Sequence, residues 1–280
     1  MVIDQESHVG SDGRDRVAAM SLSTSGGIRR WSPLQTAVQL MFCVASLLIA
    51  KVAYAGADLE ILTSEIAGMA EKSATPGSPH GIALDMLDAI GDEAGLSVSY
   101  HFLPWLRAQK MVQYRPGTLI APLTRTSERE SHYLWITHLY DYHQVLLTMA
   151  PNRPPATIAE AANQRIGVLR SSAGVDLLEK LGVHYQAGET ETMNALKLAA
   201  GRIDVWMVPD VVALPSLRHA KLDPGKFLVG GTVGATGSIY LAASPAFDPA
   251  LAGRLRDAAA RAAHKKKLQA IQQRYQLRSE

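Results

Sequence analysis

Short apolar runs alternate with longer amphipathic stretches along residues 56–280. The run Leu59–Thr63 alternates apolar and polar side chains and predicts a strand. Apolar residues then recur at helical spacing over residues 83–94, and Gly95 follows, where a helix commonly ends. Residues 97–102 alternate with period two and predict a second strand. Strands and helices therefore follow one another about every 10–15 residues, which indicates α/β architecture with parallel sheets.

The same alternation continues to the end of the chain. Further strands are expected over residues 118–123, 165–169, 203–208 and 238–243. Further helices are expected over residues 105–114, 172–181 and 190–200, and from Asp248-Pro249 onward, where an aspartate cap precedes a proline in the first turn.

Two segments interrupt this alternation and bracket a unit of their own. They are Asn152–Pro155, with two consecutive prolines, and the glycine-rich stretch 230–237. The glycines form neither a G-x-G-x-x-G pattern nor a phosphate-binding loop, so a hinge is favoured over a phosphate cradle. Two hinge crossings predict a two-lobed protein, with one lobe of residues 56–148 plus 236–280 and the other of residues 149–235.

Residues 1–55 differ from the remainder of the chain. Arg29 and Arg30 precede an apolar stretch from Leu40 to Ala50, and the small residues Ala53 and Ala55 follow at positions −3 and −1 of a cleavage site. This order is typical of a secretory signal peptide, so we expect export to the periplasm with cleavage near Ala55. The stretch is shorter than the roughly 20 residues that span a bilayer, although an interfacial anchoring helix is the alternative.

Composition and motifs exclude several classes of protein. The only cysteine is Cys43, so residues 56–280 can hold neither a disulfide nor a thiol nucleophile. The formal net charge is +2, without the basic stripe of a nucleic-acid-binding protein. No catalytic or cofactor motif is present, and the spacing of His132, His138 and His143 suits no common zinc site. We therefore expect no nucleic-acid partner, no cofactor and no metal.

The segment Leu123–Glu130 is the richest in binding chemistry. It follows an apolar strand directly, and open α/β sheets present their ligand-binding groups at the carboxyl ends of strands. Threonine hydroxyls lie there beside Arg125 and Arg129, and guanidinium groups bind carboxylates in bidentate fashion. A solvated loop with Arg–Glu ion pairs explains the same residues equally well.

The order of several segments resembles a known family over residues 57–276. These segments are the helix start at Gly81-Ile82, the Thr126…Arg129 step, the strand 166–168 leading to Ser172, and Gly201–Asp204. Together they resemble the extracellular solute-binding proteins of polar amino-acid ABC transporters. The resemblance implies a two-lobed, type II periplasmic-binding-protein fold, a small-molecule ligand, a membrane permease as partner, a monomer, and no enzymatic activity.

The resemblance also implies roles for individual residues. Arg129 corresponds to the residue that binds the ligand carboxylate, with Thr126 and Thr124 beside it. A helix beginning at Ser172 would direct its amides at the same anion. Asp210 is the nearest match to the carboxylate that accepts the ligand's amino group, but it lies one residue farther from Asp204 than expected.

Three further residues are candidates for the walls of the cleft. The Pro104-Trp105-Leu106-Arg107-Ala108 element resembles a subgroup of the family. Trp105 and Arg107 are expected to contact the ligand. The alternative is that Trp105 packs in the core, since tryptophan is buried on average. Glu65 follows the first strand and is expected to face the cleft. The second hypothesis is a periplasmic enzyme built on this fold. Its candidate acid–base pair is Glu65 with a nearby histidine. The third hypothesis is a ligand-sensing input module retained at the membrane.

Overall fold

The computed structural model describes residues 59–72 and 79–276. The chain divides into a unit of residues Met1–Ala55 and a unit of residues Gly56–Glu280, and only the second is described below. The predicted signal peptide therefore lies outside the described residues. No described helix is both long enough and apolar enough to cross a membrane.

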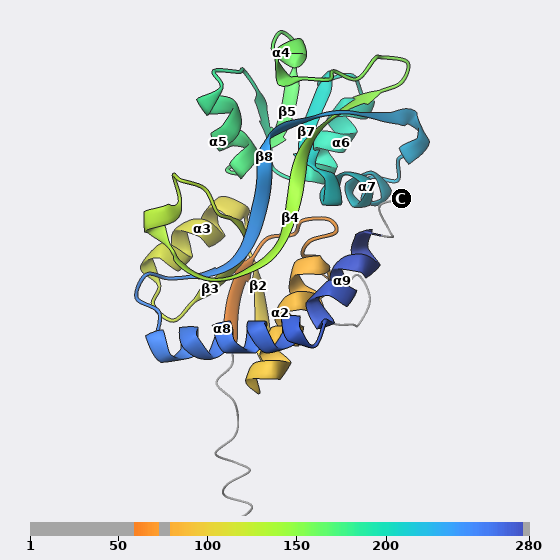
Figure 1. Ribbon diagram of the computed structural model, residues 1–280. Coiled ribbons are helices and arrows are strands. Elements are labelled where there is room, and N and C mark those ends of the chain that lie inside the picture. The colour runs from red at the N-terminus through yellow and green to blue at the C-terminus, as the bar shows by residue number, and fades with distance from the viewer. Residues whose placement is uncertain (1–58, 73–78, 277–280) are drawn as a thin grey trace, which may run out of the picture. The chain divides into compact units, whose positions relative to one another are not determined.

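The described residues form one mixed sheet of eight strands in the order β2-β1-β3-β8-β4-β7-β5-β6 (Figure 1). The strands are β1 (Leu59–Thr63), β2 (Val98–Phe102), β3 (Leu119–Thr124), β4 (Leu134–Met149), β5 (Ile166–Leu169), β6 (Gln186–Gly188), β7 (Val205–Pro209) and β8 (Phe227–Ala243). The helices are α2 (Ile82–Ala94), α3 (Trp105–Tyr114), α4 (Ile158–Ala161), α5 (Ala173–Lys180), α6 (Glu191–Ala199), α7 (Asp210–His219), α8 (Pro249–His264) and α9 (Lys267–Gln276).

Each end of the sheet contains parallel strands joined by helices. At one end β1 pairs in parallel with β2 and with β3, and at the other β5 pairs in parallel with β6 and with β7. We call β1–β3 with α2, α3, α8 and α9 the β1 group, and β5–β7 with α4–α7 the β5 group. The predicted α/β class is confirmed, and both groups follow the expected alternation of strand and helix.

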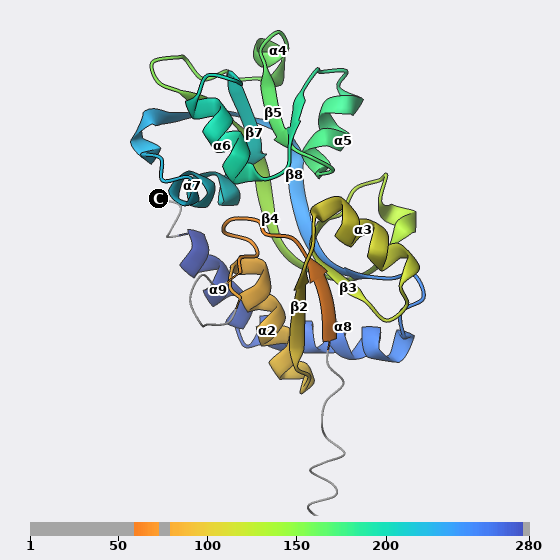
Figure 2. The same ribbon diagram turned by 180° about the vertical axis from the view of Figure 1, so that it is seen from behind.

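The two long strands β4 and β8 connect these groups. They pair antiparallel from Met149↔Phe227 to Leu134↔Ala243, with several register shifts between. Figures 1 and 2 show them side by side, running from the β1 group to the β5 group. The parallel pairing expected from the sequence therefore holds at the two ends but not at the centre, where β8 also pairs antiparallel with β3, and β4 with β7.

The glycine-rich stretch 230–237 lies inside β8 and is not an irregular crossing. Its glycines reflect the close approach of other chain segments. A Cβ on Gly231 would lie 1.7 Å from the carbonyl oxygen of Ala156, and one on Gly237 would lie 2.5 Å from the ring of Tyr142. No side chain larger than hydrogen fits at either position without displacing a neighbour.

Local capping sets the ends of the helices as the sequence indicated. Gly95 ends α2 in the left-handed conformation with φ 64°, where glycine has no steric penalty. Ser172 and Asp248 cap α5 and α8 by accepting hydrogen bonds from Gly174 N and Ala250 N. Helix α5 therefore begins directly after β5, with its first amides at the carboxyl end of that strand.

Candidate functional site

The turn after β3 buries an arginine. Arg129 N donates to Thr126 O at 3.1 Å, and a 3-10 turn over Glu130–His132 follows. This turn directs the Arg129 side chain inward, so that the residue is only 8% exposed. A guanidinium is almost never fully buried unless it is paired, so its partners define what the site can do.

Arg129 connects the β1 group to the β5 group. Its Nη1 donates to Thr124 O at 3.3 Å and its Nη2 to Ser171 O at 3.2 Å. The same Nη2 lies 3.0 Å from Oδ2 of Asp176, on helix α5. A guanidinium carries five N–H donors, so these contacts leave Nε and one hydrogen of Nη1 without a partner among the described residues.

A small cavity lies against Arg129, and we call it the Arg129 cavity. It has a volume of about 40 Å³, enough for a few water molecules. Both groups of elements and the connecting strands contribute to its walls. The lining side chains that carry polar atoms or aromatic rings are Trp105, Thr124, Arg129, Tyr142, Gln144, Ser172 and Glu191.

Hydroxyl and amide groups occupy one wall of this cavity. Thr124 Oγ1 lies 3.1 Å from the Tyr142 hydroxyl, which joins the end of β3 to β4. Gln144, two residues farther along β4, is 7% exposed, and its Oε1 is buried without a hydrogen-bond partner. A buried acceptor with no partner costs about 1–3 kcal/mol, so Gln144 is a strong candidate for a ligand contact.

The amino end of helix α5 forms part of another wall. Ser172 and Ala173, at the cap and first residue of α5, both line the Arg129 cavity. The partial positive charge of a helix amino end favours an anion there, as the Arg129 guanidinium does. Ser172 thus lies where the sequence predicted it. Ser171, with φ 57°, turns its carbonyl to Arg129 and to Gln109 Nε2, at 3.2 and 3.0 Å.

Glu191 is a lining residue that the sequence analysis missed. It is the first residue of α6 and only 5% exposed, and its Oε2 accepts from Trp206 Nε1 at 2.9 Å and Asn194 Nδ2 at 3.2 Å. Burial raises the pKa of Glu191 to about 7, although these two hydrogen bonds act to lower it. In the sequence it follows the cap Thr190 and resembles an ordinary first-turn carboxylate; only tertiary packing buries it.

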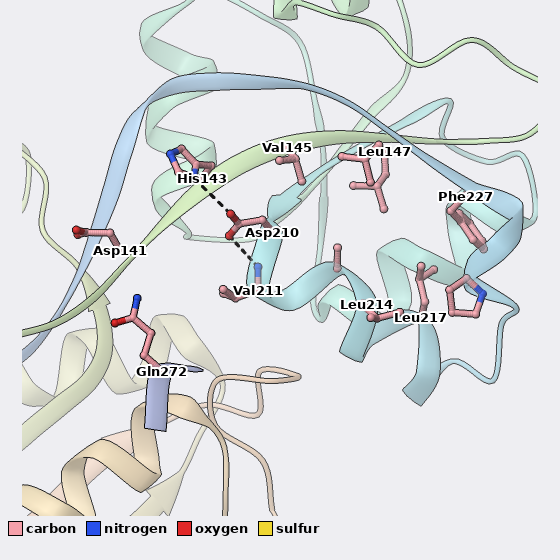
Figure 3. A pocket seen from close by; sticks show the side chains of 13 residues that line it. Asp141, His143, Val145, Leu147, Asp210, Val211, Leu214, Leu217, Phe227 and Gln272 are labelled. Atoms are coloured by element: carbon pink, nitrogen blue, oxygen red, sulfur yellow. Dashed lines mark hydrogen bonds and ion pairs between the residues drawn. The ribbon is translucent and has the colours of Figure 1, made fainter. Parts of the chain in front are cut away.

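Asp210 lines a different cavity, which we call the Asp210 cavity (Figure 3). Its Oδ2 lies 3.4 Å from His143 Nδ1, and its Oδ1 accepts from Val211 N at 2.8 Å. The preceding residue, Pro209, lines the Arg129 cavity together with Met207. Strand β7 ends at Pro209 and Asp210 is the first residue of α7, so the one extra residue noted in the sequence places the Asp210 carboxylate at the start of that helix and in the other cavity.

Strand β4 separates the two cavities by the alternation of its side chains. Tyr142 and Gln144 line the Arg129 cavity, whereas Asp141, His143 and Val145 line the Asp210 cavity. Two cavities with different chemistry thus share the strand that joins the two groups of elements.

The Asp210 cavity is the larger of the two, at about 580 Å³. Its acids already have protein partners, since Asp141 accepts from Ser238 Oγ at 2.7 Å and pairs with His138 at 2.8 Å, and Asp210 pairs with His143. Apart from Gln272, apolar side chains form the rest of its wall, including Leu217 and Phe227 (Figure 3). We regard the Arg129 cavity as the candidate ligand site, because unpaired donors and a buried unpaired acceptor meet there.

The remaining predicted residues are divided between cavity and surface. Trp105 is 9% exposed and lines the Arg129 cavity while packing in an apolar cluster, so it belongs both to the cavity wall and to the core. Thr126 lines a neighbouring hollow, together with Asp176. Arg107 and Glu65 are exposed and line neither named cavity; Glu65 pairs with Lys72 at 3.8 Å.

Two of the three histidines flagged in the sequence lie beside single carboxylates, whereas His132 Nδ1 lies 3.0 Å from the backbone oxygen of Glu128. His138 contacts Asp141, and His143 contacts Asp210. Within residues 59–72 and 79–276, no group of three or more histidine, cysteine or acidic side chains is arranged to hold a metal ion.

Sequence comparison assigns the family. Residues 69–278 match the bacterial extracellular solute-binding proteins, family 3, and the chain belongs to that family. A comparison with curated protein sequences finds no match.

Solved structures share the fold. A histidine kinase sensor domain with similarity to periplasmic binding proteins superposes with a TM-score of 0.72 at 15% identity, over 79% of this chain and 96% of that one. A substrate-binding protein of an ABC uptake transporter from Streptococcus pneumoniae, with bound histidine, superposes with a TM-score of 0.70 at 18% identity. The match covers 78% of this chain and 92% of that one. The arginine-, lysine-, histidine-binding protein ArtJ from Geobacillus stearothermophilus superposes with a TM-score of 0.64 at 20% identity, over 78% of this chain and 95% of that one. These structures establish the periplasmic-binding-protein fold.

Proposed function

We propose that this chain is an exported solute-binding protein that holds a small carboxylate-bearing ligand against Arg129. The observation that carries the proposal is the buried guanidinium, which keeps two N–H donors unpaired beside the amino end of α5. Both features favour an anion, and a buried Arg–carboxylate pair combines charge with geometric specificity. Thr124 and Tyr142 supply neutral hydroxyls next to the same charge.

Ligand entry requires movement, because a cavity of about 40 Å³ is far smaller than the few hundred Å³ of ordinary small-molecule sites. We propose that residues 56–148 plus 236–280 form one lobe and residues 149–235 the other. The lobes separate by bending of β4 and β8, which are the connections between them. The contacts of Arg129 and Gln109 with Ser171, and of Arg129 with Asp176, then close the lobes over the ligand.

The biological setting follows from the family. We propose that residues 1–55 direct export, with cleavage near Ala55, and that the protein acts in the periplasm as a monomer. An ABC permease in the inner membrane would receive the ligand from the closed form. Glu65 has Lys72 and not a histidine as its partner, so the residues offered for an enzymatic role do not form an acid–base pair.

A sensor role is the second candidate, favoured by the similarity of the fold to a histidine kinase sensor domain. The two roles differ in the fate of the amino-terminal region. Mass spectrometry of the protein isolated from its native host discriminates them: a chain beginning near Gly56 supports a released binding protein, and peptides from residues 40–50 support a sensor held at the membrane.

A thermal-shift screen tests the carboxylate proposal directly. A ligand that binds only the native protein raises its melting temperature by mass action. We expect a rise with one or more amino acids or small organic acids, no rise with the corresponding amides, and loss of the rise in Arg129→Gln. An equal shift for the acid and its amide would contradict the role of Arg129.

A further inference from the structure

A buried carboxylate lies between two histidines in the segment that joins β1 to α2. Glu71 is 9% exposed, and its Oε1 accepts a hydrogen bond from Gly68 N. Its Oε2 lies 3.1 Å from Nε2 of His219 and 3.4 Å from Nε2 of His80. A buried carboxylate is costly unless it is paired, so the charge on these imidazoles determines how well Glu71 is compensated.

The two histidines belong to different parts of the fold. His80 precedes α2, and its backbone exchanges two hydrogen bonds with that of Glu71, at 2.7 and 3.0 Å. His219 is the last residue of α7, in the β5 group. The turn at Gly68 packs directly on the same helix, since a Cβ there would lie 2.7 Å from Val211 O. The pair of Glu71 with His219 therefore crosses from one proposed lobe to the other.

This contact is separate from those that Arg129 makes. Arg129 and Gln109 bind the Ser171 carbonyl just before α5, whereas Glu71 contacts α7. Figures 1 and 2 show α5 and α7 on opposite sides of the connecting strands β4 and β8. Arginine stays charged at every physiological pH, whereas histidine gains and loses its proton near neutrality. Of the two sets of contacts, the one at α7 can therefore respond to pH.

We propose that Glu71 and His219 form a proton-dependent latch between the lobes, so that the closed arrangement is increasingly favoured as the pH falls from about 8 to about 5.5. The proposal rests on the proposed function, because it requires two lobes that move. An imidazolium 3.1 Å from a buried carboxylate is more stable than one in solvent. Closure and protonation of His219 therefore favour each other, and the gain is lost as the pH rises and the imidazole becomes neutral.

Two other influences on the histidines are the same in the open and closed arrangements. His80 lies in the same lobe as Glu71, so their ion pair does not depend on closure. The carboxyl end of α7 favours a positive charge on His219 whether or not the lobes are apart. Neither influence changes the balance between the two arrangements with pH in the way that the pair across the lobes does.

The remaining charged or titratable side chains around Glu71 do not change charge in this range. Arg218 and Tyr275 line the same hollow, from α7 and α9. Arginine keeps its positive charge, and burial raises the pKa of Tyr275 to about 12, so the tyrosine hydroxyl stays neutral. Lys72, the next residue along the chain, pairs with Glu65 at 3.8 Å.

Energy transfer between two dyes measures the arrangement of the lobes without any ligand. The dyes are attached through Tyr114→Cys on α3 and Lys180→Cys on α5, both at exposed positions, in a Cys43→Ser background. The ratio of closed to open molecules is measured from pH 8 to pH 5.5 in the otherwise wild-type protein, in His219→Gln and in the control His80→Gln. Glutamine supplies an amide donor in place of the imidazole N–H but takes up no proton.

We expect the closed-to-open ratio to rise at least threefold more in the wild type than in His219→Gln over this range, a typical effect of one partly exposed ion pair. His80→Gln should follow the wild type. Glu191, whose pKa burial raises to about 7, titrates in the same range, but it is present in all three proteins. The difference between the wild type and His219→Gln therefore measures the latch alone.

The outcomes separate the latch from the proposed function. An equal rise in the wild type and in a folded His219→Gln protein would overturn the latch, as would a rise in His80→Gln as small as that in His219→Gln. In either case the thermal-shift test of Arg129 stands. A dye separation that neither pH nor any amino acid or organic acid of that screen alters would count against both proposals.

Discussion

Arg129 Nη2 lies 3.0 Å from Asp176 Oδ2, and this ion pair joins the turn after β3 to helix α5. Burial raises the pKa of Asp176, against the opposing effect of the Arg129 charge. Asp176 lines the hollows outside the Arg129 cavity and not the cavity itself. One side of the guanidinium therefore pairs with the Asp176 carboxylate, and the other side lines the Arg129 cavity. The negative charge of Asp176 weakens the positive potential that a ligand carboxylate meets in that cavity.

Asp176→Asn should tighten binding of a carboxylate ligand. The substitution removes a negative charge close to the anion site while keeping a polar side chain of the same size, so the net field at the cavity becomes more positive. We expect a roughly 5- to 30-fold lower dissociation constant by calorimetry, since partly screened charges at this range are worth about 1–2 kcal/mol.

Glu179→Gln is the matched control for that measurement. Glu179 lies on the same helix, and its carboxylate accepts from the Tyr185 hydroxyl at 2.7 Å. The control should bind as the wild type does. Weaker binding in Asp176→Asn than in the control would show instead that Asp176 positions Arg129 for the ligand. It would contradict the expectation that the charge of Asp176 opposes binding of a carboxylate.

Glu191 should make the protein less stable as the pH rises. Its pKa is about 7 in the folded protein against 4.5 for the ordinary side chain, so the folded state binds more protons between these values. The free energy of unfolding therefore falls from about pH 4.5 to about pH 7, by on the order of 3 kcal/mol in total.

Glu191→Gln should remove that dependence. Urea denaturation at intervals from pH 4.5 to 8 gives the free energy of unfolding of both proteins as a function of pH. The difference between the two curves is the contribution of Glu191. The variant should be the more stable protein above pH 7. Parallel curves over the whole range would show that Glu191 is ionised at ordinary acidic pH and would contradict its burial as a neutral acid.

Two glycines should respond in opposite directions to the same substitution. Gly231→Ala places a methyl group 1.7 Å from Ala156 O, so β8 or the segment beside it must shift. We expect a loss of about 2 kcal/mol or more in the free energy of unfolding. In Gly253→Ala, on helix α8, the methyl group meets nothing within 4 Å, and about 0.5–1 kcal/mol should be gained. Denaturation midpoints measure both, and a tolerated Gly231→Ala would contradict the packing of β8.

Much of the local structure could be predicted because short-range signals determine it. Strand β1 and helix α3 have the bounds that periodicity indicated, and Gly95, Ser172 and Asp248 cap the predicted helices. Strand β4 was not predicted, although it runs over 16 residues. The two faces of β4 line cavities of different chemistry, so polar and aromatic side chains occur on both. The strand therefore lacks the alternation of apolar and polar residues by which a strand is predicted.

The candidate site was predicted in part. Arg129, Thr124, Trp105 and Ser172 do line one cavity, since a turn after a strand and a helix cap are local features. Asp210 does not line it, because strand β7 ends one residue earlier and Asp210 begins helix α7, beside the other cavity. Glu191 and Gln144 were missed, since burial by distant segments and not sequence pattern makes them unusual.

Binding of a ligand carboxylate to Arg129 can be measured by a calorimetric comparison of two arginines. Arg125 lies four residues earlier in the same turn, but it is exposed and paired with Glu130 at 2.5 Å. Using a ligand identified by the thermal-shift screen, we expect Arg129→Gln to lose at least 100-fold in affinity, about 2.7 kcal/mol, and Arg125→Gln to lose less than threefold. Equal affinities for wild type and a folded Arg129→Gln protein would contradict the account.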